Sequence, residues 1–327
     1  MGACGQTCRR ASVAALLIVV FSVILAGCGG VAVREALDQS ERLPGQAAVA
    51  AVPFYPQEEL QCGPAALAMV LSWSGLPVQP GDLAGEVYTP HLQGSLQSAL
   101  VASARRHSRI AYPINGPEEL FAEVAAGRPV IVLLNLAFSW YPRYHYAVVI
   151  GYDRPAETVI LHSGTRSGER LSFRVFDNIW ARSEYWGLLV LPPDQMPVAP
   201  DEKAWLAAVV GLERAEQWQA AAVAYQAAAG RWPRSALSRI GLGNSRYALD
   251  DSAGAIEAFR EAVRLDPASA IAYNNLAQVL AETGRLEEAI AAARKAVELG
   301  GPHQDSCRRT LAELLEQHSG PRPGPTR

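Results

Sequence analysis

The stretch Gln57-Glu-Glu-Leu-Gln-Cys-Gly-Pro-Ala-Ala-Leu-Ala-Met-Val-Leu-Ser-Trp73 decides the fold of the first half of the chain. A single cysteine, Cys62, stands immediately before Gly63-Pro64 and an apolar run. Proline is favoured in the first turn of a helix because its missing N–H is not needed there and its φ is already helical. The stretch therefore predicts a helix from Pro64 to Ser74, closed by Gly75, with Cys62 at its N-terminus.

In this position Cys62 has the features of a nucleophile. Unpaired N–H groups and the helix dipole favour an anion at a helix N-terminus. The thiolate is the attacking form of cysteine, and such a site lowers the thiol pKa from its free value of about 8.5. A buried, inert cysteine is the alternative, but the residues that follow Cys62 argue against it. We predict an activated cysteine.

A cysteine nucleophile needs a base and donors for the developing oxyanion. His145 is the favoured base because it opens the strand-like run His145–Tyr152, although an edge histidine bonded to backbone would look the same. The order cysteine on a helix, then histidine on a strand, is that of papain-type enzymes. Four other histidines fall in a loop, at a helix end, or in the helical part and its tail: His91, His107, His303 and His318.

A glutamine side chain is the expected oxyanion donor, together with the backbone N–H of the cysteine. Gln57 lies five residues before Cys62, and Gln61 is next to it. Adjacency makes it hard for the Gln61 amide to face the same carbonyl oxygen, so Gln57 is favoured. The alternative is that Gln57 or Gln61 is only a polar surface residue with no role in catalysis.

The N-terminus has the pattern of a targeting segment. Arg9-Arg10 precede the apolar stretch Ala11–Ala26, which ends in Leu25-Ala26-Gly27-Cys28 and resembles a bacterial lipobox. We predict a signal peptide over residues 1–27, lipid on Cys28 and a tether over 28–51. Gly29 in place of Asp favours the outer membrane, facing the periplasm, in a Gram-negative source. An ordinary signal peptide or an uncleaved anchor are the alternatives.

Length and composition limit the classes of protein that fit. With 327 residues and 50% hydrophobic residues, the chain is long enough for two domains, each with its own core. A net charge of −3 gives no electrostatic footprint for nucleic acid. Cys4 and Cys8 would leave with the signal, and Cys62 and Cys307 fall in different domains, so no framework disulfide is predicted.

Residues 52–192 mix helix and strand signals, which predicts an α+β domain with an antiparallel sheet. Helices come first, and hairpin-linked strands follow. The predicted helices are 64–74, 95–107, 117–126 and 174–182, and the predicted strands are 129–136, 145–152, 158–162 and 185–191.

A proline-rich linker over residues 193–201 separates this domain from a helical part that repeats. Ala221, Ala255 and Ala289 follow one another at 34 residues, as do Tyr225 and Phe259. A period of 34 with small residues where helices cross is the tetratricopeptide signature, and a generic alanine-rich bundle would not keep it. We predict about three repeats over residues 202–317 and a frayed tail over 318–327.

Four segments of the first domain together resemble the bacteriocin-processing, double-glycine leader peptidase family. They are Pro53–Gln57, Cys62–Leu71, Gly127–Val132 and His145–Asp153. The resemblance covers about residues 52–192. It implies a papain-like cysteine peptidase fold with a cysteine–histidine–aspartate site and a glutamine in the oxyanion hole.

Carried over to this chain, the resemblance makes Cys62 the nucleophile, His145 the general base and acid, and Gln57 the oxyanion donor. The family's glutamine usually stands one residue further from the cysteine. Its aspartate usually follows the histidine on the next strand, where this chain has Ser163. A serine hydroxyl would orient the imidazole less strongly, and Asp153 matches a different position, in a turn.

The sequence thus predicts a lipid-anchored cysteine peptidase that needs no metal or cofactor and acts on a peptide or protein. The repeats would bind a substrate or a partner protein. A peptide-binding scaffold that has lost turnover is the alternative, and the missing aspartate supports it. Another acyl transfer at the same site, such as amide hydrolysis of peptidoglycan stems or transglutamination, also fits.

Overall fold

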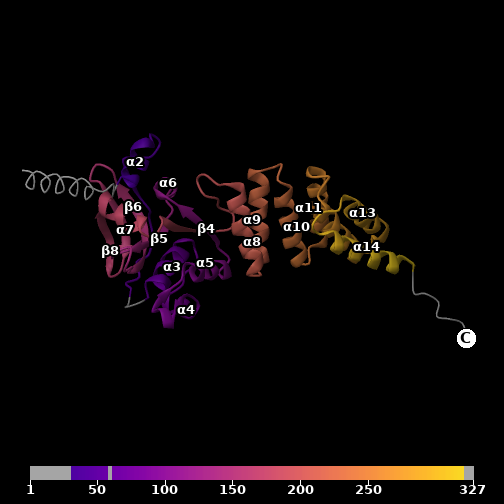
Figure 1. The fold of residues 1–327 in the computed structure, drawn as a ribbon, viewed down its shortest axis with the longest axis horizontal. Helices are drawn as coiled ribbons and strands as arrows, with labels where there is room; N and C mark the ends of the chain where they lie inside the picture. Colours follow the sequence, from indigo (N-terminus) through magenta and orange to yellow (C-terminus); the bar gives the residue numbers. More distant parts are fainter. Residues whose placement is uncertain (1–30, 58–60, 320–327) are drawn as a thin grey trace, which may run out of the picture.

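A computed structural model describes residues 31–57 and 61–319 and shows a sheet-containing half followed by a row of helices (Figure 1). The predicted signal peptide and the lipidation of Cys28 lie outside the described residues, as does most of the predicted tail. No helix in the described ranges has the length and apolar character to cross a membrane.

The first half is built on a seven-stranded antiparallel sheet in the order β4-β9-β5-β6-β7-β8, with β1 paired to the far end of β6. Its strands are β1 (Gln46–Ala48), β4 (Ile110–Asn115), β5 (Val130–Asn135), β6 (Tyr144–Asp153), β7 (Thr158–Ser163), β8 (Arg166–Ser172) and β9 (Trp186–Leu191). A small ribbon of β2 (Tyr88–Thr89) and β3 (Gly94–Ser95), joined by the short helix η1 (Pro90–Leu92), stands apart.

Helices cover both faces of the sheet, so the domain has three layers. One face packs against α3 (Cys62–Trp73) and α5 (Gln97–Arg106), with α4 (Pro80–Val87) outside them. The other face packs against α6 (Pro117–Ala125) and α7 (Phe173–Ala181), with α2 (Ala32–Gln39) against these two helices. The predicted α+β domain with an antiparallel sheet is confirmed.

Strand β5 shows why the core forms where it does. Val130, Val132 and Leu134 join the core on the α6 side, whereas Ile131 and Leu133 join the core on the α3 side. Side chains alternate between the two faces of a strand, so a strand buried on both faces is apolar throughout.

The predicted tether over residues 28–51 is wrong for the part that the structure describes. Helix α2 buries Val33 and Leu37 completely against α6 and α7, and β1 pairs with β6. Sequence reasoning missed these elements because α2 is a short helix and β1 has only three residues. Their stability comes from contacts with distant parts of the chain.

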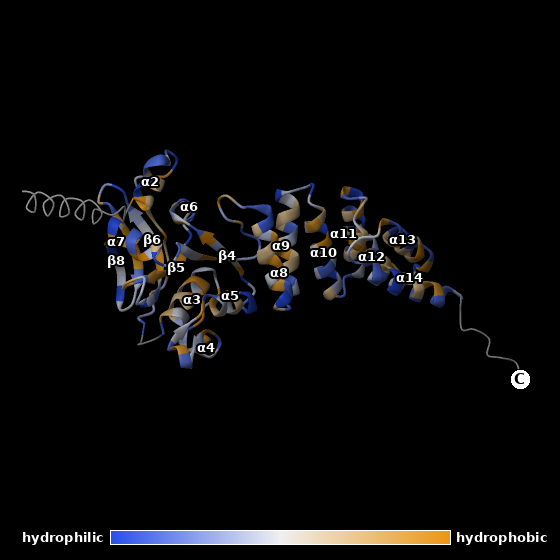
Figure 2. Cartoon of the chain, in the orientation of Figure 1, coloured by the Kyte–Doolittle hydropathy of each residue, from blue (hydrophilic) through white to orange (hydrophobic). Residues whose placement is uncertain are grey.

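The second half consists of paired helices, as the period of 34 predicts. They are α8 (Glu202–Arg214), α9 (Trp218–Arg231), α10 (Ala236–Ala248), α11 (Ser252–Leu265), α12 (Ala270–Glu282), α13 (Leu286–Leu299) and α14 (Gln304–Ser319). Figure 2 shows hydrophobic and hydrophilic residues mixed along these helices, as expected where one side of each helix is buried.

Small residues let the repeat helices approach closely. Ala221, Ala255 and Ala289 are all fully buried. Gly241 of α10 lies under the ring of Tyr225 from α9, and a Cβ there would stand 2.2 Å from the Cζ atom of that ring. A methyl group at this position cannot fit unless the helices move apart.

The two halves share one hydrophobic core. Trp205 and Leu212 of α8 belong to the same cluster of buried residues as the strands β4 and β9. The predicted linker runs along this junction, and the Val198 N–H donates to Glu123 of α6 at 2.6 Å. The linker is therefore attached to the sheet domain along its path.

Candidate active site

Cys62 is the first residue of α3, two residues before the predicted start. The helix packs against β6 (Figure 1), and all of its residues from Gly63 to Leu71 are buried. Gly63 is required here because a Cβ would stand 2.4 Å from the Ser95 Oγ. Backbone N–H groups of Tyr146, Gly63 and Cys62 itself point to the sulfur. The thiol therefore lies between the N-terminus of α3 and the neighbouring strand β6.

His145 is the second residue of β6, and its Nε2 atom lies 3.1 Å from the Oγ atom of Ser163, the last residue of β7. In a neutral imidazole one nitrogen carries the proton and the other a lone pair. When Nε2–H donates to the serine hydroxyl, the lone pair is on Nδ1. Ser163 therefore contacts the imidazole at the position where the sequence predicted an orienting group.

Gln57 is fixed by two contacts, one with the turn after β7 and one with β6. Its backbone N–H donates to the Gly164 carbonyl at 3.0 Å, and its Nε2 donates to the Tyr146 carbonyl at 3.3 Å. The Nε2 group has a second N–H that this bond leaves free. Gln61, the rival, is the N-cap residue of α3.

One pocket of about 650 Å³ brings these residues together. Gln57, Cys62 and His145, which come from three separate segments, all line it. Its lining also contains four apolar residues, Leu92, Leu96, Leu136 and Pro142, which we call the apolar rim, beside the polar Gln93 and Arg143. Next to this rim, the loop after β5 leaves Phe138 and Trp140 mostly exposed, with their rings stacked 5.5 Å apart.

Burial shifts the pKa values of Cys62 and His145 in the directions that favour their neutral forms. It raises the pKa of the Cys62 thiol, although the three backbone N–H groups oppose it. It also lowers the pKa of His145, although the negative charge of Glu169 opposes it. The predicted lowering of the thiol pKa is wrong, because the loss of hydration outweighs the effect of the helix N-terminus.

Both shifts favour a thiol and a neutral imidazole at neutral pH. Within the part of the chain that the structure describes, His145 is hydrogen-bonded to Ser163 and not to the sulfur. Catalytic hydrogen bonds are often long in the free enzyme and shorten when substrate is bound.

Glu169 is a residue that sequence reasoning missed. It lies on β8 opposite Leu161, two residues from Ser163 on β7, and forms an ion pair with Arg166 at 2.6 Å. Its side chain is 18% exposed. The strand was not predicted because its sequence, Arg-Ser-Gly-Glu-Arg-Leu-Ser, is polar. The period-two pattern that would have revealed it is weak.

Asp153 and His162 have structural roles. Asp153 stands at the opposite end of β6 from His145, where it accepts from the Ala156 N–H and pairs with Arg170 at 3.6 Å. His162 is buried, and its Nδ1 accepts from the Gly168 N–H at 3.1 Å.

The described residues contain no group of three or more His, Cys, Asp or Glu side chains that could hold a metal ion.

Comparison with known proteins agrees with this fold. Residues 49–186 match the Peptidase_C39 like family, and residues 206–270 and 240–303 match the tetratricopeptide repeat model. The first half is thus a papain-like, C39-like peptidase domain. The chain as a whole combines this domain with a run of tetratricopeptide repeats. None of the curated proteins matches the sequence.

Three solved structures illustrate the likeness. A protein of Bacillus anthracis assigned as a C39-like peptidase is 20% identical, with 45% of this chain and 97% of that chain covered and a TM-score of 0.39. The first TPR of Spaghetti (RPAP3), bound to an HSP90 peptide, is 16% identical over 36% and 94%, with a TM-score of 0.35. The type III secretion translocator chaperone SycD of Yersinia enterocolitica is 18% identical over 36% and 85%, with a TM-score of 0.34.

Proposed function

We propose that the protein is a cysteine peptidase that hydrolyses peptide bonds at Cys62 and His145. The observation that carries this proposal is the pocket lined by Gln57, Cys62 and His145, in which a nucleophile, a base and an oxyanion donor converge from three segments. A purely structural cysteine would need neither an imidazole nor a free amide N–H in the same cavity.

The first half-reaction is acyl transfer to the sulfur. As Sγ attacks the carbonyl carbon of the scissile bond, His145 takes the thiol proton on the nitrogen that Ser163 leaves free. The second N–H of Gln57 and the backbone N–H of Cys62 hold the oxyanion. The C–N bond then breaks, and the imidazolium gives its proton to the leaving amine.

Water completes the cycle. His145, neutral again, takes a proton from water as it attacks the thioester, and the acid product leaves while Cys62 recovers its proton. The imidazolium that forms in each step carries a positive charge, which the carboxylate of Glu169 stabilises through space. A neutral resting pair suits this route, because the proton moves only when the carbonyl is in place.

The apolar rim supports a preference for substrates with apolar side chains near the cleaved bond, since Leu92, Leu96 and Leu136 are about half exposed around the pocket. We further propose that lipid on Cys28 anchors the protein in the cell envelope, facing the periplasm. The repeats would then bind a substrate or a partner protein.

A scaffold that binds peptides without cleaving them is the second candidate. Two observations favour it. The partner of His145 is a hydroxyl and not a carboxylate, and burial raises the thiol pKa. Both reduce the reactivity of the pair.

Labelling with a peptidyl epoxide separates the two candidates, because opening the epoxide needs both an attacking sulfur and a proton donor. The peptidase predicts adduct on Cys62, none in Cys62→Ala, and a rate about 100-fold lower in His145→Ala. His91→Ala, which removes an exposed histidine outside the pocket, is the matched control. A labelling rate that does not depend on His145 would establish the scaffold.

A further inference from the structure

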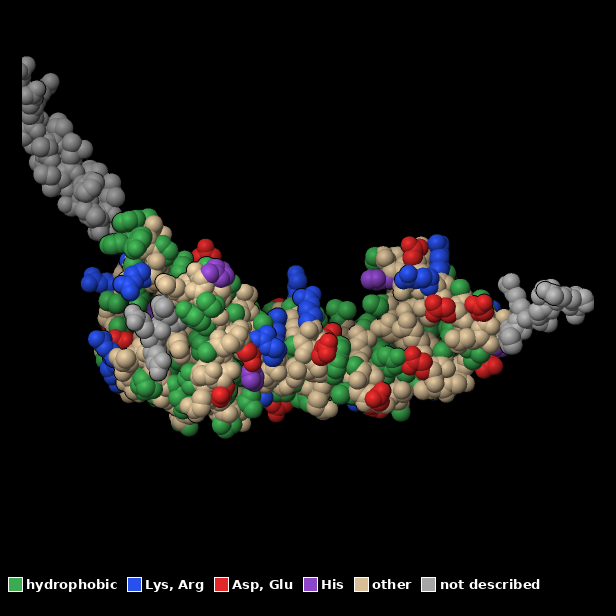
Figure 3. Space-filling view, turned by 90° about the horizontal axis from the view of Figure 1, so that it is seen from below, with side chains coloured by type: hydrophobic (Ala, Val, Ile, Leu, Met, Phe, Trp, Pro, Cys, Tyr) green, Lys and Arg blue, Asp and Glu red, His purple; other side chains and the backbone are tan. Residues whose placement is uncertain are grey.

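A second cavity, of about 930 Å³, lies in the repeats between α10, α11 and the turn from α12 to α13. Five arginines line it: Arg239, Arg246, Arg260, Arg264 and Arg285. We call this cavity the arginine groove. In Figure 3 the helical half is hollowed along one edge, and Lys and Arg side chains stand beside the hollow.

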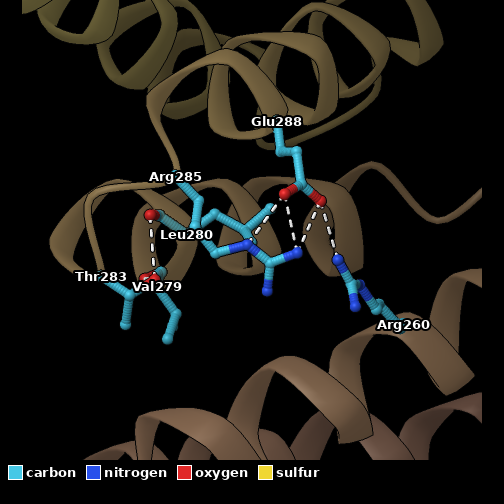
Figure 4. Close-up of polar contacts among 6 residues, drawn as sticks. All are labelled: Arg260, Val279, Leu280, Thr283, Arg285 and Glu288. Carbon is cyan, nitrogen blue, oxygen red and sulfur yellow. Dashed lines mark hydrogen bonds and ion pairs between the residues drawn. The ribbon is translucent and has the colours of Figure 1, made fainter.

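One end of the groove has two guanidinium groups for one carboxylate. Arg260 of α11 and Arg285 reach Glu288 of α13 at 2.8 and 2.7 Å (Figure 4). Thr283 closes α12 by donating its hydroxyl to the Val279 and Leu280 carbonyls, and so fixes the turn that carries Arg285. Because two arginines share one glutamate, this end of the groove keeps an excess of positive charge.

The remaining arginines differ in how they are paired: Arg264 forms a close two-pronged pair, Arg246 is paired loosely, and Arg239 has an unpaired Nε–H. Arg264 pairs with Glu261 at 2.6 Å, and Arg246 lies 3.5 Å from Glu257, whose side chain is 82% exposed. The Nε–H of Arg239 is buried without a hydrogen-bond partner among the described residues. Exposed ion pairs contribute little stability, so the carboxylates of a ligand can replace them.

The spacing of the arginines suits an extended peptide. Arg260 and Arg264 are four residues apart on α11, which is about 6 Å along the helix axis. Alternate side chains of an extended chain point to the same side and are about 7 Å apart. Two carboxylates at alternate positions would therefore meet these two guanidinium groups, which bind carboxylates with charge-assisted hydrogen bonds.

We propose that the arginine groove binds an extended, acidic segment of a partner polypeptide with carboxylates at alternate positions. This inference rests on the proposed role of the repeats in binding a polypeptide, and it is independent of catalysis at Cys62. A peptide is favoured over an anionic membrane because the arginines surround a cavity with Leu242 and Ile256 in its lining. A bilayer surface would not enter such a cavity.

Fluorescence anisotropy tests this proposal on the purified full chain carrying Cys62→Ala, so that no bound peptide is cleaved. The probe is a labelled peptide in which glutamate and serine alternate, with a lysine–serine peptide as the control. We expect the acidic peptide alone to bind, and its affinity to fall with added salt. Arg260→Gln and Arg264→Gln should each weaken binding about tenfold.

Arg294→Gln, which removes an exposed arginine of α13 outside the groove, should leave the affinity unchanged. Circular dichroism of each variant shows whether its helices are intact. Absence of acidic-peptide binding, equal binding of the lysine peptide, or full affinity in both groove variants would each overturn the proposal. So would co-sedimentation with phosphatidylglycerol vesicles in place of peptide binding. None of these outcomes changes the epoxide labelling of Cys62 in the original protein, so failure of the groove and failure of the peptidase are distinguishable.

Discussion

The candidate active site and the arginine groove differ in their exposure to water: the reactive groups of the first are largely buried, and the charged groups of the second are largely exposed. In the pocket, burial shifts the pKa values of Cys62 and His145 toward their neutral forms. In the groove, Arg264 and Glu257 keep 67% and 82% of their side chains exposed to water. The first site is suited to moving protons and the second to attracting charge. Hence pH should control cleavage, and ionic strength should control binding.

Replacing the nucleophile should have the largest effect, because it should abolish cleavage at the active site and leave peptide binding in the groove intact. Cys62→Ala should lower cleavage of a fluorescence-quenched peptide library by about 10⁴-fold or more, because the covalent intermediate cannot form. Binding of the acidic peptide should be unchanged. Cys307→Ala, which removes the other free cysteine of the described chain, is the control and should still cleave. A variant at Cys62 that still cleaves would end the peptidase proposal.

The shared core should make the two halves unfold together. Trp205 is fully buried at the junction, and its indole N–H donates to the Ala224 carbonyl at 3.3 Å. Trp205→Ala should lower the free energy of unfolding by about 3–5 kcal/mol. Urea denaturation followed by far-ultraviolet circular dichroism measures this change. A small loss confined to one of two transitions would show that the halves are energetically independent.

Loss of the hydroxyl at Ser163 should have a moderate effect on catalysis. Ser163→Ala removes the bond to Nε2 of His145, and kcat should fall about tenfold, the worth of one hydrogen bond, with KM little changed. Ser163→Asp would supply a carboxylate and should raise both kcat and the pKa of His145. Steady-state kinetics of both variants test this, and equal kcat values in all three proteins would remove Ser163 from the site.

The smallest expected effect concerns pH. Cleavage needs a neutral His145, and burial lowers its pKa below the usual 6.5, so kcat/KM should fall only on the acid side of that value. Glu169 raises this pKa, so Glu169→Gln should move the acid limb to still lower pH. Asp153→Asn, at the far end of β6, is the matched control. An acid limb that stays in place in Glu169→Gln would show that Glu169 has no electrostatic role.

The sequence predicted those parts of the molecule that depend on local pattern. The helix that follows Cys62, the strand that begins near His145 and the period of 34 in the repeats are all short-range signals, and the structure has them, with the helix beginning two residues earlier than predicted. Ser163 could be named because it occupies a family position. The roles of these residues in catalysis stay predictions.

What the sequence could not predict depends on long-range pairing and on burial. The position of Glu169 follows from the pairing of β8 with β7, and β8 is too polar to be recognised as a strand. The place of α2 follows from contacts with α6 and α7. The direction of the Cys62 pKa shift depends on how completely neighbouring segments exclude water, which no local motif records.

The core that Trp205 shares with the sheet has a geometric consequence. It prevents the repeats from swinging freely about the proline-rich segment, so the distance between the groove and the thiol is set by the fold. A polypeptide bound at both sites at once would therefore have to span this fixed distance. The bond presented for cutting would lie a constant number of residues from the acidic stretch, whatever sequence came between them.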